Sequence, residues 1–228
     1  PNRVAIITDT LFGIRKGSQI LHDYFEKFYK EVFFPTLDKE GIKTVLHLGD
    51  CFDVRKGIDY WSLDWAKRVF FHPLQERGIQ THIIVGNHDI FYKNTLKINA
   101  PGLNLNEYEN VTCYSTPQDV RVEDENVFFI PWICEDNAEE CTEALANSES
   151  SVAMGHLEIA GCYANQNYKF QHGTYARNLQ KFEKVFPIHF HKKTNKGNMT
   201  YLSTHYQLKL HDEWDHGRLQ LVDIGTKE

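Results

Sequence analysis

The sequence has no apolar run that approaches the roughly 18 consecutive residues of a membrane-spanning helix, so we expect no transmembrane segment and no membrane partner. Its first residues, PNRV, lead directly into a strand-like stretch, without the basic and apolar regions of a signal peptide. Internal repeats, low-complexity tracts and Ser/Gly-rich linkers are also lacking. We therefore expect a protein of the cytoplasm.

Cysteine pairing and an excess of positive charge are absent as well. The five cysteines are scattered, odd in number and never spaced as CxxC, which argues against a disulfide framework or a zinc ribbon and favours a reducing compartment. The formal net charge is -6, so the chain does not hold nucleic acid by overall charge alone. A nucleic-acid substrate would need local positive charge, such as a metal ion.

The first half of the chain alternates between strand and helix patterns. Apolar residues recur at helical spacing over residues 19–40, where Pro35 ends or kinks the helix, and over residues 60–76. Short apolar runs before, between and after these helices are typical of buried strands, at residues 4–7, 44–48 and 82–85. This alternation predicts parallel strands joined by right-handed crossovers.

The second half is richer in short strands and predicts a second, mixed sheet. One short helix is expected at residues 138–146. The expected strands lie at residues 111–114, 120–122, 127–130, 151–154, 184–186, 199–202, 206–210 and 218–222. The length of 228 residues suits one sizeable α/β domain.

Five of the expected strands end in residues that can bind metal ions. In chain order these ends read Asp9, Gly49-Asp50, Gly86-Asn87-His88-Asp89, Gly155-His156 and His189-Phe190-His191. Parallel sheets place their ligand sites at the carboxyl ends of the strands, so the five ends should converge. The glycines allow the backbone to turn sharply there, and Asp89 is expected to support its loop.

The donor types indicate two divalent cations. Carboxylates and an amide suit Mn²⁺ or Mg²⁺, imidazoles suit Mn²⁺, Fe²⁺ or Zn²⁺, and one carboxylate can bridge two ions. Taken singly, each end has an ordinary structural explanation, Asp9 as a turn residue and His156 as a buried histidine with satisfied hydrogen bonds. Together and in this order, the five ends favour a metal centre.

The ends follow the motifs D-x-H, G-D-x-x-D, G-N-H-D/E, G-H and G-H-x-H of the calcineurin-like metallophosphoesterase superfamily, which the chain resembles over about its whole length. Within it, the chain is most similar to SbcD-type exonucleases of double-strand-break repair, particularly the recombination nuclease subunits of large phages, through GDCFD at residues 49–53 and MGH at residues 154–156. The resemblance implies an α/β fold with two mixed β-sheets in a sandwich flanked by helices.

The resemblance also implies which residues bind the metal ions. The first ion would be held by Asp9, Asp50 and His191, and the second by Asp50, Asn87, His156 and His189, with Asp50 as the bridge. Mn²⁺ is the expected ion, with Mg²⁺, Fe²⁺ or Zn²⁺ as alternatives.

The same resemblance makes His88 the catalytic residue that faces the scissile phosphate. Asp53 would orient the His88 ring and fix its tautomer. Alternatively, Asp53 is an ordinary surface charge at the start of a helix. Basic residues follow three of the metal-binding ends, and Arg15, Arg55 and Lys192 would bind the substrate backbone unless they are ordinary solvated charges.

The chain departs from the family pattern at three places. Leu11 stands where D-x-H has histidine, Ile188 stands where glycine usually precedes His-x-His, and His205 follows a strand where relatives often have glycine. Leucine cannot coordinate a metal ion, so the first metal would keep three protein ligands. We expect at least roughly a 10–100-fold loss of metal affinity or activity from this change.

Three functions are consistent with this pattern. The first is a two-metal phosphodiesterase that cleaves DNA as a 3′→5′ exonuclease or endonuclease in double-strand-break repair or recombination. Its partners would be DNA and an SMC-like coiled-coil ATPase subunit, with a homodimer as one option. The second is a catalytically degenerate scaffold for protein partners, and the third is a phosphodiesterase or phosphatase for small molecules. Residues 1–228 would form one nuclease domain, with the C-terminal cap and ATPase-binding region absent or reduced to residues 212–228.

Overall fold

The computed structural model describes residues 3–53, 56–157, 179–187 and 220–225. Its first sheet has the strand order β4-β3-β2-β1-β9. Strands β1 to β4 pair in parallel, while β9 runs antiparallel to β1 at the edge. The strands of this sheet are β1 (Arg3–Ile7), β2 (Thr44–His47), β3 (Gln80–Ile84), β4 (Val111–Tyr114) and β9 (Gln220–Asp223).

The second sheet has the strand order β5-β6-β7-β8. Strands β5 and β6 form an antiparallel hairpin, and β6, β7 and β8 pair in parallel. The strands of this sheet are β5 (Gln118–Val122), β6 (Glu125–Ile130), β7 (Val152–Gly155) and β8 (Lys184–Pro187). Both sheets are mixed, as the resemblance implied.

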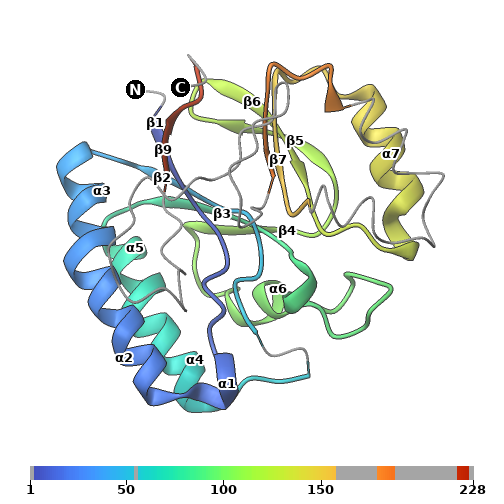
Figure 1. Ribbon diagram of the computed structural model, residues 1–228. Coiled ribbons are helices and arrows are strands. Elements are labelled where there is room, and N and C mark those ends of the chain that lie inside the picture. Colours follow the sequence, from blue (N-terminus) through green and yellow to red (C-terminus); the bar gives the residue numbers. More distant parts are fainter. Residues whose placement is uncertain (1–2, 54–55, 158–178, 188–219, 226–228) are drawn as a thin grey trace.

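Alternating residues of the central strands face two different hydrophobic cores. Val4 and Ile6 of β1 lie between the two sheets, with Phe129 of the second sheet, whereas Ala5 and Ile7 face the helices. Successive side chains of a strand point to opposite faces, so a strand with apolar residues at every position must be covered on both sides. Helices on the outer faces complete a four-layer α/β sandwich (Figure 1). The predicted fold class is confirmed.

The two helices predicted over residues 19–40 and 60–76 are confirmed, and each contains a π-helical turn that ends two residues before a proline. These helical segments are α2 (Gln19–Phe28), η1 (Tyr29–Phe33) and α3 (Phe34–Glu40), and then α4 (Tyr60–Ala66), η2 (Lys67–Phe71) and α5 (His72–Glu76). Pro35 and Pro73 lack the backbone N–H that an α-helix needs and crowd the preceding turn. The widened turn accommodates each ring without ending the helix.

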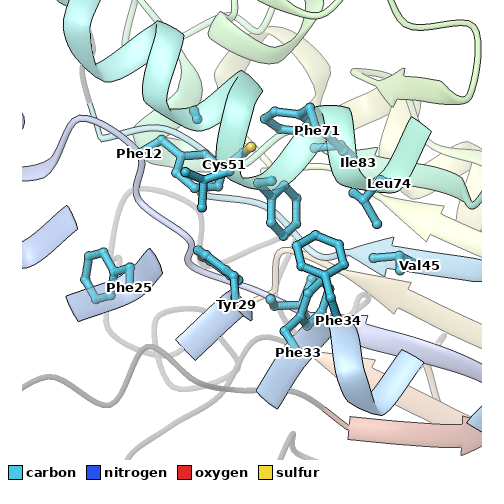
Figure 2. Packing of buried hydrophobic residues seen from close by; sticks show 14 of the residues in the cluster. Phe12, Phe25, Tyr29, Phe33, Phe34, Val45, Cys51, Phe71, Leu74 and Ile83 are labelled. Carbon is cyan, nitrogen blue, oxygen red and sulfur yellow. The ribbon is translucent and has the colours of Figure 1, made fainter. Parts of the chain in front are cut away.

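Aromatic rings fill the space between these helices and the first sheet. Phe70 lies at the centre of this cluster, with ring centroids 5.3 Å from Phe12, 5.2 Å from Tyr29, 5.5 Å from Phe33 and 5.0 Å from Phe71. Figure 2 shows Phe12, Tyr29 and Phe33 of this cluster close to the strands of the sheet. Phe12 lies in the loop that follows β1, so this cluster also supports the loop that contains Asp9.

The outer face of the second sheet is covered by α7 (Ala138–Asn147), within one residue of its predicted end. The remaining short elements are α1 (Ile14–Gly17), η3 (Asn87–Asp89), α6 (Ala100–Asn104) and η4 (Glu135–Asn137). The strands predicted at residues 199–202 and 206–210 lie outside the described residues. Within the described ranges, no helix has the length and apolar character to cross a bilayer.

We predict that Phe70→Ala lowers the free energy of unfolding by about 3–5 kcal/mol, because it removes a fully buried ring from the centre of the aromatic cluster. The measurement is urea denaturation followed by circular dichroism. Ile20→Ala is the control, because Ile20 is 83% exposed, and it should change the stability by less than about 0.5 kcal/mol. Equal effects of the two changes would contradict this packing.

Candidate metal centre and active site

The loops that follow β1 and β2 lie side by side because the parallel pairing continues beyond both strands. The backbone N–H groups of Asp9, Leu11 and Phe12 donate to the carbonyls of Gly49 (3.1 Å), Asp50 (3.1 Å) and Cys51 (2.9 Å). These hydrogen bonds hold the Asp9 loop in register with the Asp50 loop. The two carboxylates predicted to bind metal therefore extend from neighbouring backbones.

Three residues in these two loops adopt a left-handed backbone conformation. The φ angle is 54° at Asp9, 48° at Leu11 and 54° at Asp50. Aspartate tolerates this conformation better than most residues, whereas leucine rarely adopts it. Such strain is maintained only where the surrounding structure fixes the backbone, and it is concentrated at functional sites.

Two glycines make room for the polar side chains. A Cβ atom on Gly86 would lie 2.4 Å from both the backbone nitrogen and Oδ1 of Asp50. A Cβ atom on Gly49, which has a φ of 111°, would lie 2.4 Å from Nδ1 of His156. Any larger residue at either position would separate Asp50 from the β3 loop or displace the His156 ring.

The Asp89 carboxylate joins the β2 and β3 loops. It is buried and accepts hydrogen bonds from the backbone N–H groups of Cys51 (3.3 Å), Phe52 (2.8 Å) and Gly86 (2.9 Å). Burial and the nearby Asp50 charge raise the pKa of Asp89 to about 7, against the effect of these donors. The predicted role of Asp89 as a support of its loop is confirmed.

Asp50, Asn87 and His156 lie together at the centre of the site. Nε2 of His156 lies 2.8 Å from Oδ1 of Asn87 and 3.4 Å from Oδ2 of Asp50. Nδ1 of His156 donates to the Leu48 carbonyl at 2.9 Å, which leaves a lone pair on Nε2 in the neutral ring. Beside this neutral ring the amide oxygen of Asn87 faces only acceptors, and a rotated amide would instead donate to Asp50 at 3.1 and 3.3 Å and to Nε2 of His156 at 2.8 Å. A protonated ring would donate from Nε2 to the unrotated amide oxygen.

The carboxylates of this cluster favour a positive charge between them. Burial opposes protonation of His156, yet the charges of Asp50 and Asp9 raise the pKa of His156 to about 9. Burial also opposes ionisation of Asp50, yet the nearby His156 and His88 hold the Asp50 pKa below its usual value. A divalent cation would satisfy the same acceptors in place of the proton.

Oxygen and imidazole donors of this kind fit Mn²⁺ or a similar ion. Among the described residues, no three His, Cys, Asp or Glu side chains are grouped as a metal site. The amide of Asn87 lies beside His156 and adds an oxygen donor to the cluster. The predicted ligands His189 and His191 lie outside the described residues.

His88 and Asp53 form a second polar pair beside the cluster. Nδ1 of His88 lies 2.7 Å from Oδ1 of Asp53, and the backbone N–H of His88 donates to Oδ1 of Asp50 at 2.9 Å. Because a carboxylate only accepts, Nδ1 carries the proton and Nε2 points away from Asp53. The His88 side chain is 40% exposed, so a substrate can reach this nitrogen.

The predicted substrate-binding residues are described only in part. Arg15 is exposed in α1, directly after the Asp9 loop, with a left-handed φ of 50°. Arg55 and Lys192 lie outside the described residues.

Sequence reasoning missed His47, a buried histidine beneath the site. Its Nδ1 accepts from the Gly49 N–H at 3.1 Å, and its Nε2 lies 2.8 Å from Oγ1 of Thr10, which donates to the Cys51 carbonyl at 3.0 Å. Burial lowers the pKa of His47 to about 3, so the ring is neutral and links the two loops. The available signal was a histidine inside the apolar run that ends in Gly49-Asp50.

Comparison with known proteins agrees with this arrangement. Residues 2–224 match the family model described as calcineurin-like phosphoesterase. The chain belongs to the calcineurin-like phosphoesterase family. Members of this family use divalent metal ions, typically two.

One curated relative of this phosphoesterase is exonuclease subunit 1 of Enterobacteria phage T4. It is 35% identical over 189 residues, which are 83% of this chain and 55% of the relative. The chain therefore spans about half the length of the relative that it matches. The predicted resemblance to phage exonuclease subunits is confirmed.

Two solved structures superpose on this chain. A dimetal phosphatase from Danio rerio superposes with a TM-score of 0.50 at 11% identity, over 87% of this chain and 85% of the other. An archaeal phosphodiesterase superposes with a TM-score of 0.45 at 12% identity, over 99% and 96% of the two chains. The similarity to the phosphatase supports the sandwich architecture of this phosphoesterase.

We predict that His47 makes the metal-free protein less stable as the pH falls below about 6.5. The pKa of His47 in the folded protein is about 3, below its value in the unfolded chain, so the unfolded chain takes up the additional proton. Between pH 6 and 4, the free energy of unfolding should fall by roughly 1 kcal/mol per pH unit more in the wild type than in His47→Gln.

Urea denaturation in EDTA measures both slopes. His72→Gln is the matched control, because His72 is exposed on α5, and it should keep the wild-type slope. A His47→Gln slope equal to that of the wild type would show that the His47 ring is not held neutral.

Proposed function

We propose that this chain is a metal-dependent phosphodiesterase that cleaves DNA. The observation that carries the proposal is the convergence of Asp50, Asn87 and His156, beside the His88–Asp53 pair. The first group offers a cation the acceptor atoms of Asp50, Asn87 and His156, and the second offers a substrate an accessible imidazole. A cation site next to a general acid suits the cleavage of phosphate esters.

Asp9, Asp50, Asn87 and His156 would hold the metal ions, together with His189 and His191. Mn²⁺ is the ion that we propose, because the donor set mixes carboxylate, amide and imidazole. The bound ions would supply positive charge that offsets the negative charge developing on the phosphate. Gly49 and Gly86 bring the donors close together, and the buried Asp89 carboxylate keeps the two loops in place.

His88 would act on the leaving group. Hydrolysis forms a bond from a water oxygen to phosphorus and breaks the bond from phosphorus to the leaving oxygen. With the His88 ring doubly protonated, Nε2 would give its proton to that leaving oxygen, the attacking water would release a proton to solvent, and the ring would take up a proton from solvent before the next turnover. The Nδ1–H of His88 donates a hydrogen bond to Oδ1 of Asp53, which keeps a proton on Nδ1 and fixes the direction of the ring. His88 would be the catalytic residue and Asp53 its positioning residue.

DNA is the proposed substrate because the 35% identical phage relative is named as an exonuclease subunit. The word subunit also supports a partner protein, which we propose to be an SMC-like coiled-coil ATPase. Exposed Arg15 lies just past the Asp9 loop and would contact the phosphate backbone. We place the reaction in double-strand-break repair or recombination.

Leu11 favours a second candidate function, that of a scaffold with weakened or lost catalysis. The Leu11 side chain packs against the aromatic core and offers no donor atom to a metal ion. Its φ of 48° is disfavoured for leucine but is adopted several-fold more often by histidine. Leu11→His therefore adds a donor without adding backbone strain, which makes it a direct test of the two candidates.

We predict that Asp50→Asn lowers Mn²⁺-dependent cleavage of end-labelled duplex DNA by at least roughly 100-fold, because it removes the carboxylate shared by the cluster. Leu11→His should raise the activity by about 10-fold or more. Asp124→Asn is the matched control, an exposed aspartate in the β5–β6 turn, and should keep wild-type activity.

Each contrary outcome has a separate meaning. Unchanged cleavage by Asp50→Asn would refute the proposed metal centre. Lack of cleavage by both the wild type and Leu11→His would support the scaffold. Turnover of bis(p-nitrophenyl) phosphate without any action on duplex or single-stranded DNA would favour small phosphate esters as substrates.

We predict that His88→Gln lowers kcat for DNA cleavage by roughly 10²–10⁴-fold with a smaller change in KM, because a general acid acts in the transition state. Asp53→Asn should lower kcat less and shift the pH dependence of kcat, because the imidazole loses its carboxylate partner. Steady-state kinetics from pH 6 to 9 provide both values. A pH profile unchanged by Asp53→Asn would show that Asp53 acts only in folding.

A further inference from the structure

The loop that follows His88 exposes several large apolar side chains. Phe91 is 39% exposed, Tyr92 50% and Ile98 43%, and the loop continues into α6. Single exposed apolar side chains are common on protein surfaces, whereas neighbouring large ones that form one patch often mark a binding site.

The exposure of this loop is not the result of loose packing. Ile90 and Asn99 form a bridge at its base, and the Phe91 N–H donates to the Ile98 carbonyl at 3.1 Å. Ile90 and Leu96 are buried with Val85 and Cys134. The loop is further tied to η4, where Asp136 accepts a hydrogen bond from Thr95 Oγ1 at 2.9 Å.

The two aromatic rings form a pair with positively charged neighbours. The ring centroids of Phe91 and Tyr92 are 4.8 Å apart, with an interplanar angle of 82°. Lys93 and Lys97 are exposed in the same loop, and residues 90–99 contain no acidic side chain. Aromatic rings flanked by lysines suit a ligand that has flat apolar faces and a polyanionic backbone.

The rings lie within reach of the phosphate that His88 would contact. Phe91 is three residues from His88, so their Cα atoms are at most roughly 11 Å apart. Successive nucleotides of a strand are spaced by about 3.4 Å in B-form DNA. A strand with its phosphate at His88 would therefore place a base over the rings within about three nucleotides.

We propose that Phe91 and Tyr92 form a platform on which unpaired bases of a DNA strand stack beside the cleavage site. The inference rests on the proposed function and names the part of the substrate that this loop recognises. Bases of intact duplex DNA are already stacked on both faces, so the platform selects a single strand or a frayed end. Lys93 and Lys97 would contact the phosphates of the same strand.

A protein partner is the other occupant that an apolar patch suggests. The two lysines and the short chain distance to His88 favour the nucleic acid, since a strand held at His88 must pass near the loop. A platform for bases can also be recognised by experiment, because its contribution to the affinity for an oligonucleotide must vanish when the bases are removed.

The test is fluorescence anisotropy with labelled single-stranded oligonucleotides in EDTA, which prevents cleavage. One oligonucleotide carries all bases, and a second of equal length carries abasic sites. Relative to wild type, the double variant Phe91→Leu/Tyr92→Leu should raise the Kd for the normal strand by roughly 5–100-fold. The double variant should leave the Kd for the abasic strand nearly unchanged. The substitutions remove the rings and the abasic sites remove the bases, so either change abolishes the same stacking interaction.

Two further variants serve as controls. Tyr92→Phe keeps the aromatic face and should bind the normal strand like wild type. Tyr60→Leu removes an aromatic ring that is 91% exposed at the start of α4 and should also bind like wild type. An equal loss of affinity in Tyr60→Leu would overturn the assignment of the platform to this loop.

The outcomes separate this inference from the proposed function. Equal binding of the normal strand by wild type and the double variant, with wild-type DNA cleavage intact, would overturn the platform alone and favour a protein partner on this patch. Absence of both oligonucleotide binding and DNA cleavage in wild type would overturn the platform and the proposed substrate together.

Discussion

The geometry of the site depends on one buried carboxylate. Asp89 accepts backbone hydrogen bonds from Cys51 and Phe52 of the β2 loop and from Gly86 of its own loop. It therefore fixes the distance between the loop that carries Asp50 and the loop that carries Asn87 and His88. The β1 loop is then held to the β2 loop by parallel backbone hydrogen bonds, and the aromatic cluster supports it from below. The side chains that follow β1, β2 and β3 lie close together because hydrogen bonds connect the backbones of their three loops.

This construction places several negative and electron-rich groups in a region with little water. The charge of Asp50 acts on buried Asp89, and the charges of Asp50 and Asp9 both act on His156. The free energy of bringing such groups together rises steeply with burial. The fold offsets part of this repulsion with backbone donors and with His156. The rest must come from outside the chain, as a proton or a metal ion. A cluster that is unfavourable by itself but favourable around a cation is expected of a metal-binding site rather than of a purely structural core.

Much of this architecture could be predicted from the sequence, and the failures have physical reasons. The strands and helices followed from apolar periodicity, because every central strand is buried on one or both faces. The convergence of Asp50, Asn87 and His156 followed from their positions at strand ends. The π-helical turns before Pro35 and Pro73 were not predictable, because tertiary packing, not local propensity, keeps those helices continuous. His47 was missed for a similar reason, since a histidine within an apolar run has no local feature that identifies its partners.

Leu11 shows that the shape of a site and its supply of ligands are determined by different interactions. Its backbone keeps the left-handed φ of 48° although leucine disfavours that conformation, because the hydrogen bond from its N–H to Asp50 and the bond from Ile14 to its carbonyl fix the loop. The conformation is therefore specified by the neighbours of residue 11 and not by its side chain. In the proposed metal centre, the side chain at this position could therefore change between a ligand and a non-ligand without any change of fold. The family fold alone therefore does not establish catalysis in this chain, and the donor atoms at this position have to be considered separately.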